Sequence, residues 1–396
     1  MDSVFKANRE QFLAAVKLAA KLTQKEFGSL DGMLLIEGSD RRVTVSGINP
    51  GQRRIDATIG CQPLGDSWPA GVFVGGKLLI EVLTLMPSQM VRIGWNMKEL
   101  VVEGEGDESR SFLTTMKIRQ NEVARVSFKT ELAEDDSSFL INADEFGAVA
   151  GLAVTARSSD ESRPTLTCVR FELVPIDEFN SDNVRLAMVC TDGYRLVRIE
   201  TSVVSIGAMT RRNLLAPGVE MAHLASLRCT GDLRFVLAED KLEVNGVLAG
   251  DIAFRLVMRL PESNYPDYMA IIPKTDGDVI HVELRELRRH LSSAKSFRRD
   301  DHRVDVTIDS DAMKFHISDP EKGDFESACT ITRSATESVA MALNMTYFEI
   351  AVVGLLDLGI TEPTLHFHAS NRPFVLKGAK GQQQATVVIM PMIVPR

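Results

Sequence analysis

The feature that most constrains this chain is a pattern of elements that occurs three times along its 396 residues. Apolar residues recur at helical spacing within residues 5–22, 139–157 and 281–299, and the last two stretches begin with a short apolar run. The three starts lie about 130 to 140 residues apart, as expected for copies of one structural unit. No segment repeats by identity, so the repeat is one of pattern.

A second helical signal and a pair of strands follow each of these stretches. The helical signals fall at residues 75–86, 217–227 and 344–358. The strand pairs fall at residues 90–104, 232–246 and 364–378, where a charged or Gly-containing turn joins two β-rich runs, as in a hairpin. Each third of the chain therefore predicts two helices among about eight short strands. The expected fold is α+β, with three tandem copies of a two-helix, antiparallel-sheet module.

Two polar segments mark the expected boundaries between these modules. Residues 129–138 are acidic and polar, as in a solvated connector, and residues 260–268 carry two prolines and several turn formers. The predicted domains are residues 1–132, 133–267 and 268–396.

The composition is typical of a soluble globular protein, with 44% hydrophobic and 25% charged residues. The N-terminus lacks the apolar core of a signal peptide, and no apolar run is long enough to span a membrane. Five scattered cysteines favour free thiols in a reducing cytoplasm over disulfides or a metal site. The net charge of −9 argues against coating of nucleic acid, unless the basic residues gather on one face.

One predicted helix does gather basic residues. Within residues 285–299, one side of the helical wheel carries Arg285, Arg288, Arg289, Lys295 and Arg299, and the other carries Leu287, Leu291 and Ala294. Such a positive stripe can meet DNA phosphates without reading bases. An ordinary solvated helix face explains the same pattern, and for this helix taken alone it is the commoner case.

The end of the chain is unusually apolar. The last ten residues read VVIMPMIVPR, whereas chain ends usually fray and are polar. Either this segment is the last strand of a sheet, or its end forms a surface that another molecule binds. A buried strand explains the β-rich run but not the Met-Pro-Met that follows it.

Four stretches together resemble the bacterial sliding clamp family, the β subunit of DNA polymerase III. They are TDGYRLV (191–197), NYPDYMAIIPK (264–274), NMTY (344–347) and the terminal VVIMPMIVPR, in the order in which the family carries its motifs. The resemblance spans the whole chain. It implies a DNA clamp fold in a head-to-tail homodimeric ring, whose twelve helices line a central hole and whose sheets form the outer wall. An acidic outside with basic helices inside would reconcile the net charge with DNA encircled without sequence preference.

The resemblance also implies partners and site residues. A replicative polymerase, a clamp loader and other proteins with clamp-binding motifs are the expected partners, and no enzymatic activity, cofactor or metal is expected. The implied peptide-binding pocket comprises Leu166, Thr191, Gly193, Tyr194, Arg195, Leu196, Pro266, Ile271, Asn344, Tyr347, Val388, Met390, Pro391 and Met392. The candidate DNA-facing residues are Lys17, Lys21, Lys77, Arg157, Arg163, Arg285, Arg288, Arg289 and Lys295. The candidate dimer-interface residues are Phe112, Leu113 and Phe297.

The sequence departs from the family pattern at two pocket positions. Ala270 and Ile393 stand where the family commonly carries basic residues, and the chain continues to Arg396. The pocket is therefore expected to be more apolar, with a changed peptide preference. The stretch 157–165, which holds Arg157 and Arg163, matches a DNA-facing loop in position but differs in its other residues.

Other functional classes fit the sequence less well. A clamp-like monomer that keeps the pocket but not the ring would serve as an interaction hub or as a competitor for clamp partners. The least favoured hypothesis is an enzyme on a related α+β scaffold. His366 and His368 lack a third metal ligand at helpful spacing, and Asp192 is better explained as a turn residue than as a catalytic acid.

Overall fold

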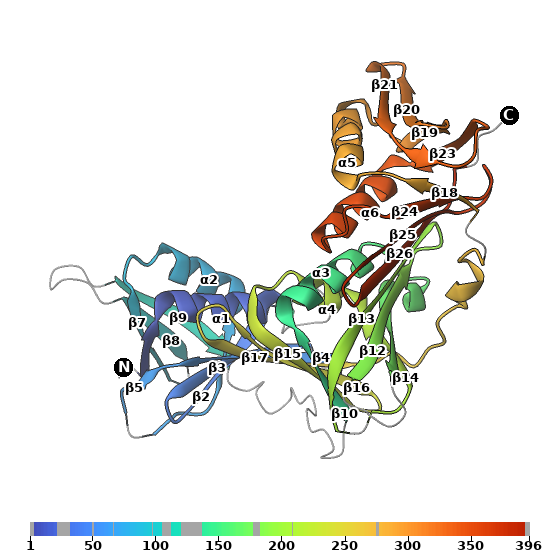
Figure 1. Ribbon diagram of the computed structural model, residues 1–396. Coiled ribbons are helices and arrows are strands. Elements are labelled where there is room, and N and C mark those ends of the chain that lie inside the picture. The colour runs from blue at the N-terminus through green and yellow to red at the C-terminus, as the bar shows by residue number, and fades with distance from the viewer. Residues whose placement is uncertain are drawn as a thin grey trace. The chain divides into compact units, whose positions relative to one another are not determined.

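The computed structural model describes residues 4–21, 32–49, 51–65, 67–96, 98–104, 112–119, 137–176, 183–207, 209–274 and 277–392. The chain divides into two compact units, which are coloured along the sequence in Figure 1. The first unit comprises Met1–Ala143 and Arg228–Leu260, and the second comprises Asp144–Leu227 and Pro261–Arg396. The three-module boundaries after residues 132 and 267 stay a prediction, and most of the expected connector at 129–138 lies outside the described residues.

The first unit is built from two helices and antiparallel strands. Helices α1 (Arg9–Lys21) and α2 (Gly76–Leu85) pack side by side, and α1 also contacts the strands beneath it (Figure 1). The strands are β1 (Phe5–Asn8), β2 (Met33–Ser39), β3 (Arg42–Asn49), β4 (Arg53–Gly60), β5 (Gln62–Pro63), β6 (Val72–Gly75), β7 (Met90–Trp95), β8 (Glu99–Gly104), β9 (Phe112–Arg119), β10 (Ser137–Asn142), β15 (Cys229–Leu237), β16 (Lys241–Leu248) and β17 (Ile252–Arg259). Strand β17 pairs with β4, which joins residues from distant parts of the sequence.

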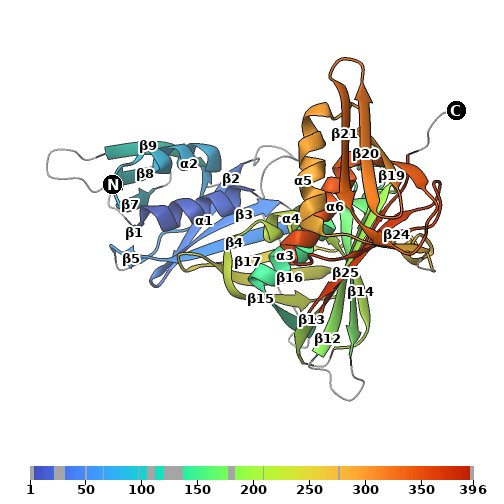
Figure 2. The same ribbon diagram turned by 45° about the horizontal axis from the view of Figure 1, so that its top comes forward.

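The described residues of the second unit form four α-helices. These are α3 (Ala143–Val154), α4 (Gly218–Ala225), α5 (Leu284–Ser293) and α6 (Met345–Asp357). The strands are β11 (Cys168–Pro175), β12 (Asn183–Thr191), β13 (Arg195–Ile206), β14 (Arg212–Pro217), β18 (Asp278–His281), β19 (Arg303–Ile308), β20 (Ala312–Asp319), β21 (Gly323–Thr330), β22 (Thr332–Arg333), β23 (Val339–Asn344), β24 (Thr364–Phe367), β25 (Phe374–Lys380) and β26 (Gln383–Ile389). Figure 2 shows α5 running alongside β20 and β21.

The helices of the second unit pack as amphipathic segments. Leu284, Leu287 and Leu291 of α5 are fully buried, because their spacing places them on one face of the helix. The Glu283 side chain caps this helix by accepting hydrogen bonds from the backbone N–H groups of Arg285 and Glu286. None of the helices in the described part of the chain is long and apolar enough to cross a membrane.

The predicted pattern of helices and hairpins is confirmed in its main features. All six predicted helices are present, and the predicted hairpins are the antiparallel pairs β7–β8, β15–β16 and β24–β25. Two boundaries were wrong. Residues Phe5–Asn8, predicted as helical, form β1, because their alternating burial suits the pairing with β7. Helix α5 ends at Ser293, and Ala294–Phe297 continue as a 3₁₀ turn, η5, so Lys295 and Arg299 do not lie on α5.

The apolar end of the chain is the last strand of a sheet up to Ile389. Strand β26 pairs on one side with β13 and on the other with β25, so its backbone groups are satisfied on both sides. The described chain continues to Met392 and leaves the strand at Met390. Residues 393–396, which include Ile393, lie outside the described part.

Candidate functional site

The TDGYRLV stretch forms a tight turn between β12 and β13. The Asp192 carboxylate accepts hydrogen bonds from the backbone N–H groups of Tyr194 at 2.9 Å and Arg195 at 3.0 Å, and from Arg195 Nε at 3.1 Å. Gly193 adopts φ +95°, a backbone conformation that favours glycine. The hydroxyl of Thr191 donates to the Arg195 carbonyl at 2.7 Å. The turn holds Tyr194 outward, with its side chain 64% exposed.

The end of the chain runs directly beside this turn. The pairing of β13 with β26 places Arg195 opposite Ile389 and Leu196 opposite Val388. Past the strand, the Met390 N–H donates to the Tyr194 carbonyl at 2.8 Å, and the Met392 N–H donates to the Ala342 carbonyl on β23 at 2.8 Å. Met390, Pro391 and Met392 are partly exposed. They follow β26 beside the turn, and they line a cleft of about 830 Å³ together with residues of β19 and β23 and with Ser370 and Asn371.

Beneath the turn and the last strand lies a buried apolar cluster within the second unit, termed the apolar floor. Its members are Leu166, Cys168, Val189, Leu196, Leu215, Tyr265, Tyr268, Val375 and Val388, with Ile272 packed against them. Three members, Leu166, Leu196 and Val388, were predicted. Tyr268 and Ile272 lie within the NYPDYMAIIPK stretch but were not among the predicted pocket residues. Val375 was missed, because no local pattern distinguishes it from an ordinary core residue.

Tyr268 ties the segment after NYPDY to the sheet. Its hydroxyl donates to the Glu172 carboxylate at 2.8 Å and accepts from Arg198 Nε at 3.3 Å. Burial raises the pKa of this hydroxyl above its usual value, so it stays a neutral donor. Pro266 and Ile271 lie exposed on either side of Tyr268, each joined to it by a backbone hydrogen bond.

Arg195 links the turn to the start of α6. Its guanidinium carbon lies 4.1 Å from the centroid of the Tyr347 ring, a cation–π distance. Asn344 caps α6 by accepting a hydrogen bond from the Tyr347 N–H at 3.1 Å. The Arg195 side chain is only 13% exposed, and its Nη1 atom is buried without a hydrogen-bond partner among the described residues. The residues predicted for the peptide pocket therefore lie together, on the turn, the apolar floor, the start of α6 and the chain end.

Changing Asp192 tests the importance of the turn. We expect Asp192→Ala to weaken peptide binding by at least about tenfold, because it removes three hydrogen bonds that fix Tyr194 and Arg195, at about 0.5–1.5 kcal/mol each. Asp192→Asn serves as the matched control, since asparagine also accepts hydrogen bonds from the backbone of such turns. Fluorescence titration of a labelled partner peptide measures both variants. Equal affinity of Asp192→Ala and the unaltered chain would contradict this role of the turn.

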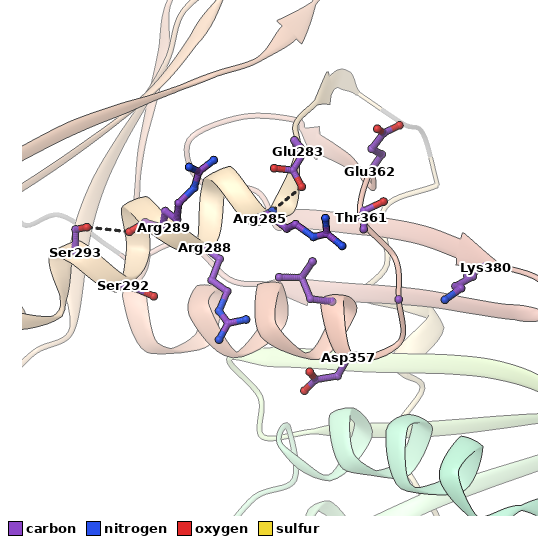
Figure 3. Close-up of a pocket in the computed structure, with 12 residues that line it drawn as sticks. Glu283, Arg285, Arg288, Arg289, Ser292, Ser293, Asp357, Thr361, Glu362 and Lys380 are labelled. Atoms are coloured by element: carbon purple, nitrogen blue, oxygen red, sulfur yellow. Dashed lines mark hydrogen bonds between the residues drawn. The ribbon is translucent and has the colours of Figure 1, made fainter.

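A second candidate surface lies along α5. A cleft of about 1340 Å³ is lined by Glu283, Arg285, Arg288, Arg289, Ser292, Ser293, Leu356, Asp357, Gly359, Thr361, Glu362 and Lys380 (Figure 3). Arg285, Arg288 and Arg289 are exposed, and none of them forms an ion pair with a described residue. These three predicted DNA-facing residues therefore share one open surface. Lys380, which sequence reasoning missed, lines the same cleft from β25.

The other predicted DNA-facing residues are more dispersed. Lys17 and Lys21 are exposed on α1, and Lys77 is exposed on α2. Lys295 is exposed in η5 and forms an ion pair with Glu349 at 2.6 Å.

The two arginines of the predicted DNA-facing loop lie near other features. Arg157 is half-buried, and its aliphatic chain passes close to Gly218. Arg163 pairs with Asp160, and its Nη1 lies 3.4 Å from the Asp192 carbonyl. Its position therefore favours the rim of the pocket over a DNA-facing surface.

The predicted interface residues lie on or near open strand edges. From Phe112 to Lys117, β9 pairs with β8, and the described residues supply no strand on its other side. Leu113 of this strand is 67% exposed, whereas the side chain of Phe112 lies outside the described part. Strand β21 is the edge of a four-stranded sheet in the second unit. Phe297 is half-buried and packs beside it against Phe325, with ring centroids 5.4 Å apart.

The described residues contain no group of three or more histidine, cysteine, aspartate or glutamate side chains placed to hold a metal. His366 is buried and its Nε2 lies 2.8 Å from the Thr364 hydroxyl. Burial raises the pKa of the Cys61 and Cys229 thiols to about 11, so neither is a ready nucleophile at neutral pH.

Comparisons with known proteins agree on one class. No protein-family model matches the chain. A β sliding clamp of Streptococcus pneumoniae is 25% identical over 293 residues, which cover 70% of this chain and 74% of that protein. A β sliding clamp of Pseudomonas putida is 23% identical over 210 residues, covering 52% of this chain and 54% of that protein.

Solved structures give the same answer for the fold. The DNA polymerase III β subunit of Borrelia burgdorferi, solved with a natural product, superposes with a TM-score of 0.81 at 19% identity, covering 100% of this chain and 99% of that one. The sliding clamp of Pseudomonas aeruginosa, solved with a ligand, gives 0.77 at 18% identity, covering 99% and 100%. The chain thus has the DNA clamp fold. In sequence as well as fold, it is a divergent relative of the bacterial β sliding clamps.

Proposed function

We propose that this chain is a processivity clamp, a non-enzymatic ring that encircles duplex DNA and tethers a polymerase. The observation that carries the proposal is the convergence of four motif-bearing stretches in the second unit. There the TDGYRLV turn, the segment after NYPDY, the start of α6 and the Met-Pro-Met end meet around one apolar floor. These are the stretches through which the sequence resembles the clamp family.

The pocket is suited to short peptides of a partner protein. Methionine side chains at Met390 and Met392 adapt to ligands of differing shape, and the buried floor provides an apolar slot. Tyr194 stands exposed at the rim, where an aromatic ring gives a large contact area at low entropic cost. The expected partners are a replicative polymerase, a clamp loader and other proteins that carry clamp-binding motifs.

The distribution of charge supports DNA as the second partner. The chain carries a net charge of −9, yet the arginines of α5 gather on one exposed surface. A ring with such helices facing inward holds DNA by topology, so that binding to the phosphates can be weak and sequence-independent. Tethering then raises the effective concentration of the polymerase at its template. A protein with these activities works in the cytoplasm.

Open strand edges support closure of the ring. Strand β9 in the first unit and β21 in the second each leave one row of backbone groups without a strand partner among the described residues. Such edges are templates for pairing with another chain. Lys117 lies on β9, and Asp324 and Glu326 lie on β21, so the two edges carry complementary charges. We infer that β9 of one protomer meets β21 of its partner, head to tail.

The topological link is tested by asking whether the protein leaves a circular DNA when that DNA is cut. The protein is loaded onto a nicked circular plasmid with the clamp loader of its source, and half of the sample is then linearised. We expect retention on the circle and loss from the linear DNA, because only a closed ring is held by topology. Equal retention on both forms would contradict encirclement. A protein that binds partner peptide but is never retained would favour the monomeric hub.

A further inference from the structure

The basic residues of the second unit are distributed unequally among its helices. Helices α3, α4 and α6 carry no lysine or arginine, whereas α5 carries three arginines. Acidic residues lie on the other helices, among them Asp144 and Glu145 on α3, and Glu349 and Asp357 on α6. Lys295, which follows α5, is already paired with Glu349. Attraction for phosphates in this unit therefore concentrates at α5.

Lys380 adds a fourth cation from a different part of the chain. It is the last residue of β25, and its side chain lies across Gly359 at the C-terminal end of α6. A Cβ atom at Gly359 would lie only 2.1 Å from the Lys380 Nζ atom, so the close approach depends on glycine there. Like Arg285 and Arg288, Lys380 lines the cleft and forms no ion pair with a described residue.

The close-up in Figure 3 shows how these groups are arranged. Arg288 extends from α5 toward Asp357, and Arg285 extends toward Thr361, on the side where Lys380 lies. Asp357 is exposed, and no ion pair within the described residues neutralises it. The cleft therefore combines four cations, Arg285, Arg288, Arg289 and Lys380, with three carboxylates, Glu283, Asp357 and Glu362, which oppose the binding of an anion.

We propose that Arg285, Arg288 and Lys380 form a cleft that binds the phosphate backbone of duplex DNA, with Asp357 limiting its affinity. This inference rests on the proposed function and adds a DNA-binding residue from outside the helices. Arg285 and Arg288 are separated by about 4.5 Å along the helix axis. Lys380 extends the group of cations beyond the helix, so that several phosphates can be bound at the same time. A polyanion is favoured over a free phosphate, because Glu283, Asp357 and Glu362 weaken the cleft for a single small anion.

The weakness of the cleft suits a clamp that moves. A site made only of arginine and lysine would hold one phosphate register tightly and slow sliding. The carboxylate of Asp357 lowers the local positive potential, so that interactions with successive phosphates form and break easily. The opposing charge thus has a functional consequence that can be measured by removing it.

A purely structural role for Lys380 makes a different prediction. Its ammonium lies near the C-terminal end of α6, where the helix dipole favours a positive charge. In that case Lys380→Ala would lower the melting temperature and leave DNA binding unaltered. Thermal unfolding and DNA binding are therefore measured on the same variants.

The experiment uses the full chain and a short fluorescent duplex, with anisotropy recorded between about 50 and 200 mM salt. We expect Lys380→Ala and Arg288→Ala each to weaken binding several-fold at low salt. Each should also reduce the slope of log K against log salt by about 0.9 for every phosphate that the variant no longer neutralises. Asp357→Asn should strengthen binding. Arg185→Ala, which removes an exposed cation on β12, is the matched control and should change neither quantity.

Three outcomes separate the possibilities. If Lys380→Ala binds the duplex as the unaltered chain does, with the same salt slope, the cleft assignment is overturned while the clamp proposal stands. Unchanged affinity of Asp357→Asn overturns the limiting role of that carboxylate. If the unaltered chain forms a stable dimer but neither binds the duplex nor is retained on circular DNA, the proposed function itself fails.

Discussion

Removal of residues 390–396 is expected to abolish binding of partner peptides while the chain remains folded and keeps its oligomeric state. Strand β26 ends at Ile389, so its pairings with β13 and β25 survive the truncation. The truncation removes the hydrogen bonds that Met390 and Met392 donate to Tyr194 and Ala342, together with one apolar wall of the pocket. If the bound peptide buries both methionine side chains, their loss at about 1.5–3 kcal/mol each amounts to a decrease of at least about 100-fold in affinity.

A labelled peptide from the polymerase of the source organism provides the measurement, by fluorescence titration at constant salt. Circular dichroism and solution mass show whether the truncated chain is folded and assembled. A shorter truncation that keeps Met390 to Met392 is the matched control and should retain most of the affinity. If the longer truncation binds the peptide as tightly as the full chain, the pocket assignment is wrong.

The sequence predicted the helices and hairpins well because each element shows its own periodicity. Its errors lie where local signals compete. Phe5–Asn8 precedes a strong helical pattern and was merged with it, although its alternation is that of a strand. Ser292 and Ser293 end α5 early: the Ser293 hydroxyl donates to the Arg289 carbonyl at 3.0 Å, and serine side chains compete with the helix backbone in this way.

The pocket was predicted through motifs, and only its motif-bearing side could be found in that way. Val375 joins a cluster with Leu166, Val189 and Leu196, which lie far from it in the chain, so no single stretch of sequence reveals its place there. Lys380 was missed for the same reason, since its place beside α5 depends on the packing of β25 near the end of α6. Conversely, Arg163 matched a DNA-facing loop in position, but the fold places its guanidinium beside the Asp192 carbonyl.

Leu113→Asp is expected to open the proposed ring. Leu113 is 67% exposed on β9, whose free edge carries unpaired backbone groups. A carboxylate there would be buried against the partner's β21, close to Asp324 and Glu326, where both desolvation and like-charge repulsion oppose association. The mass measured by light scattering should fall from about 87 kDa, which is twice the chain mass of 43.7 kDa, to the mass of the monomer. Phe297 is a poorer test, because it packs against Phe325 within its own chain and its removal also costs stability.

Leu85→Asp provides the matched control. Leu85 is also exposed, but it lies at the end of α2 and belongs to neither β9 nor β21, so this variant should remain a dimer. A Leu113→Asp protein that still measures about 87 kDa on dilution would exclude the β9 edge from the interface. If the unaltered chain has a mass of 43.7 kDa at every concentration, the proposed ring does not form, and the monomeric hub is favoured instead.

The same variant separates the two activities of the proposed clamp. The residues of the proposed pocket all belong to the second unit, whereas the proposed ring closure uses β9 of the first. Leu113→Asp should therefore bind partner peptide with unchanged affinity and yet fail to remain on circular DNA. Loss of both activities would mean that the substitution unfolds the chain or that the pocket depends on the ring. Thermal unfolding of the variant distinguishes these cases, because only a folded monomer keeps a cooperative transition near that of the control.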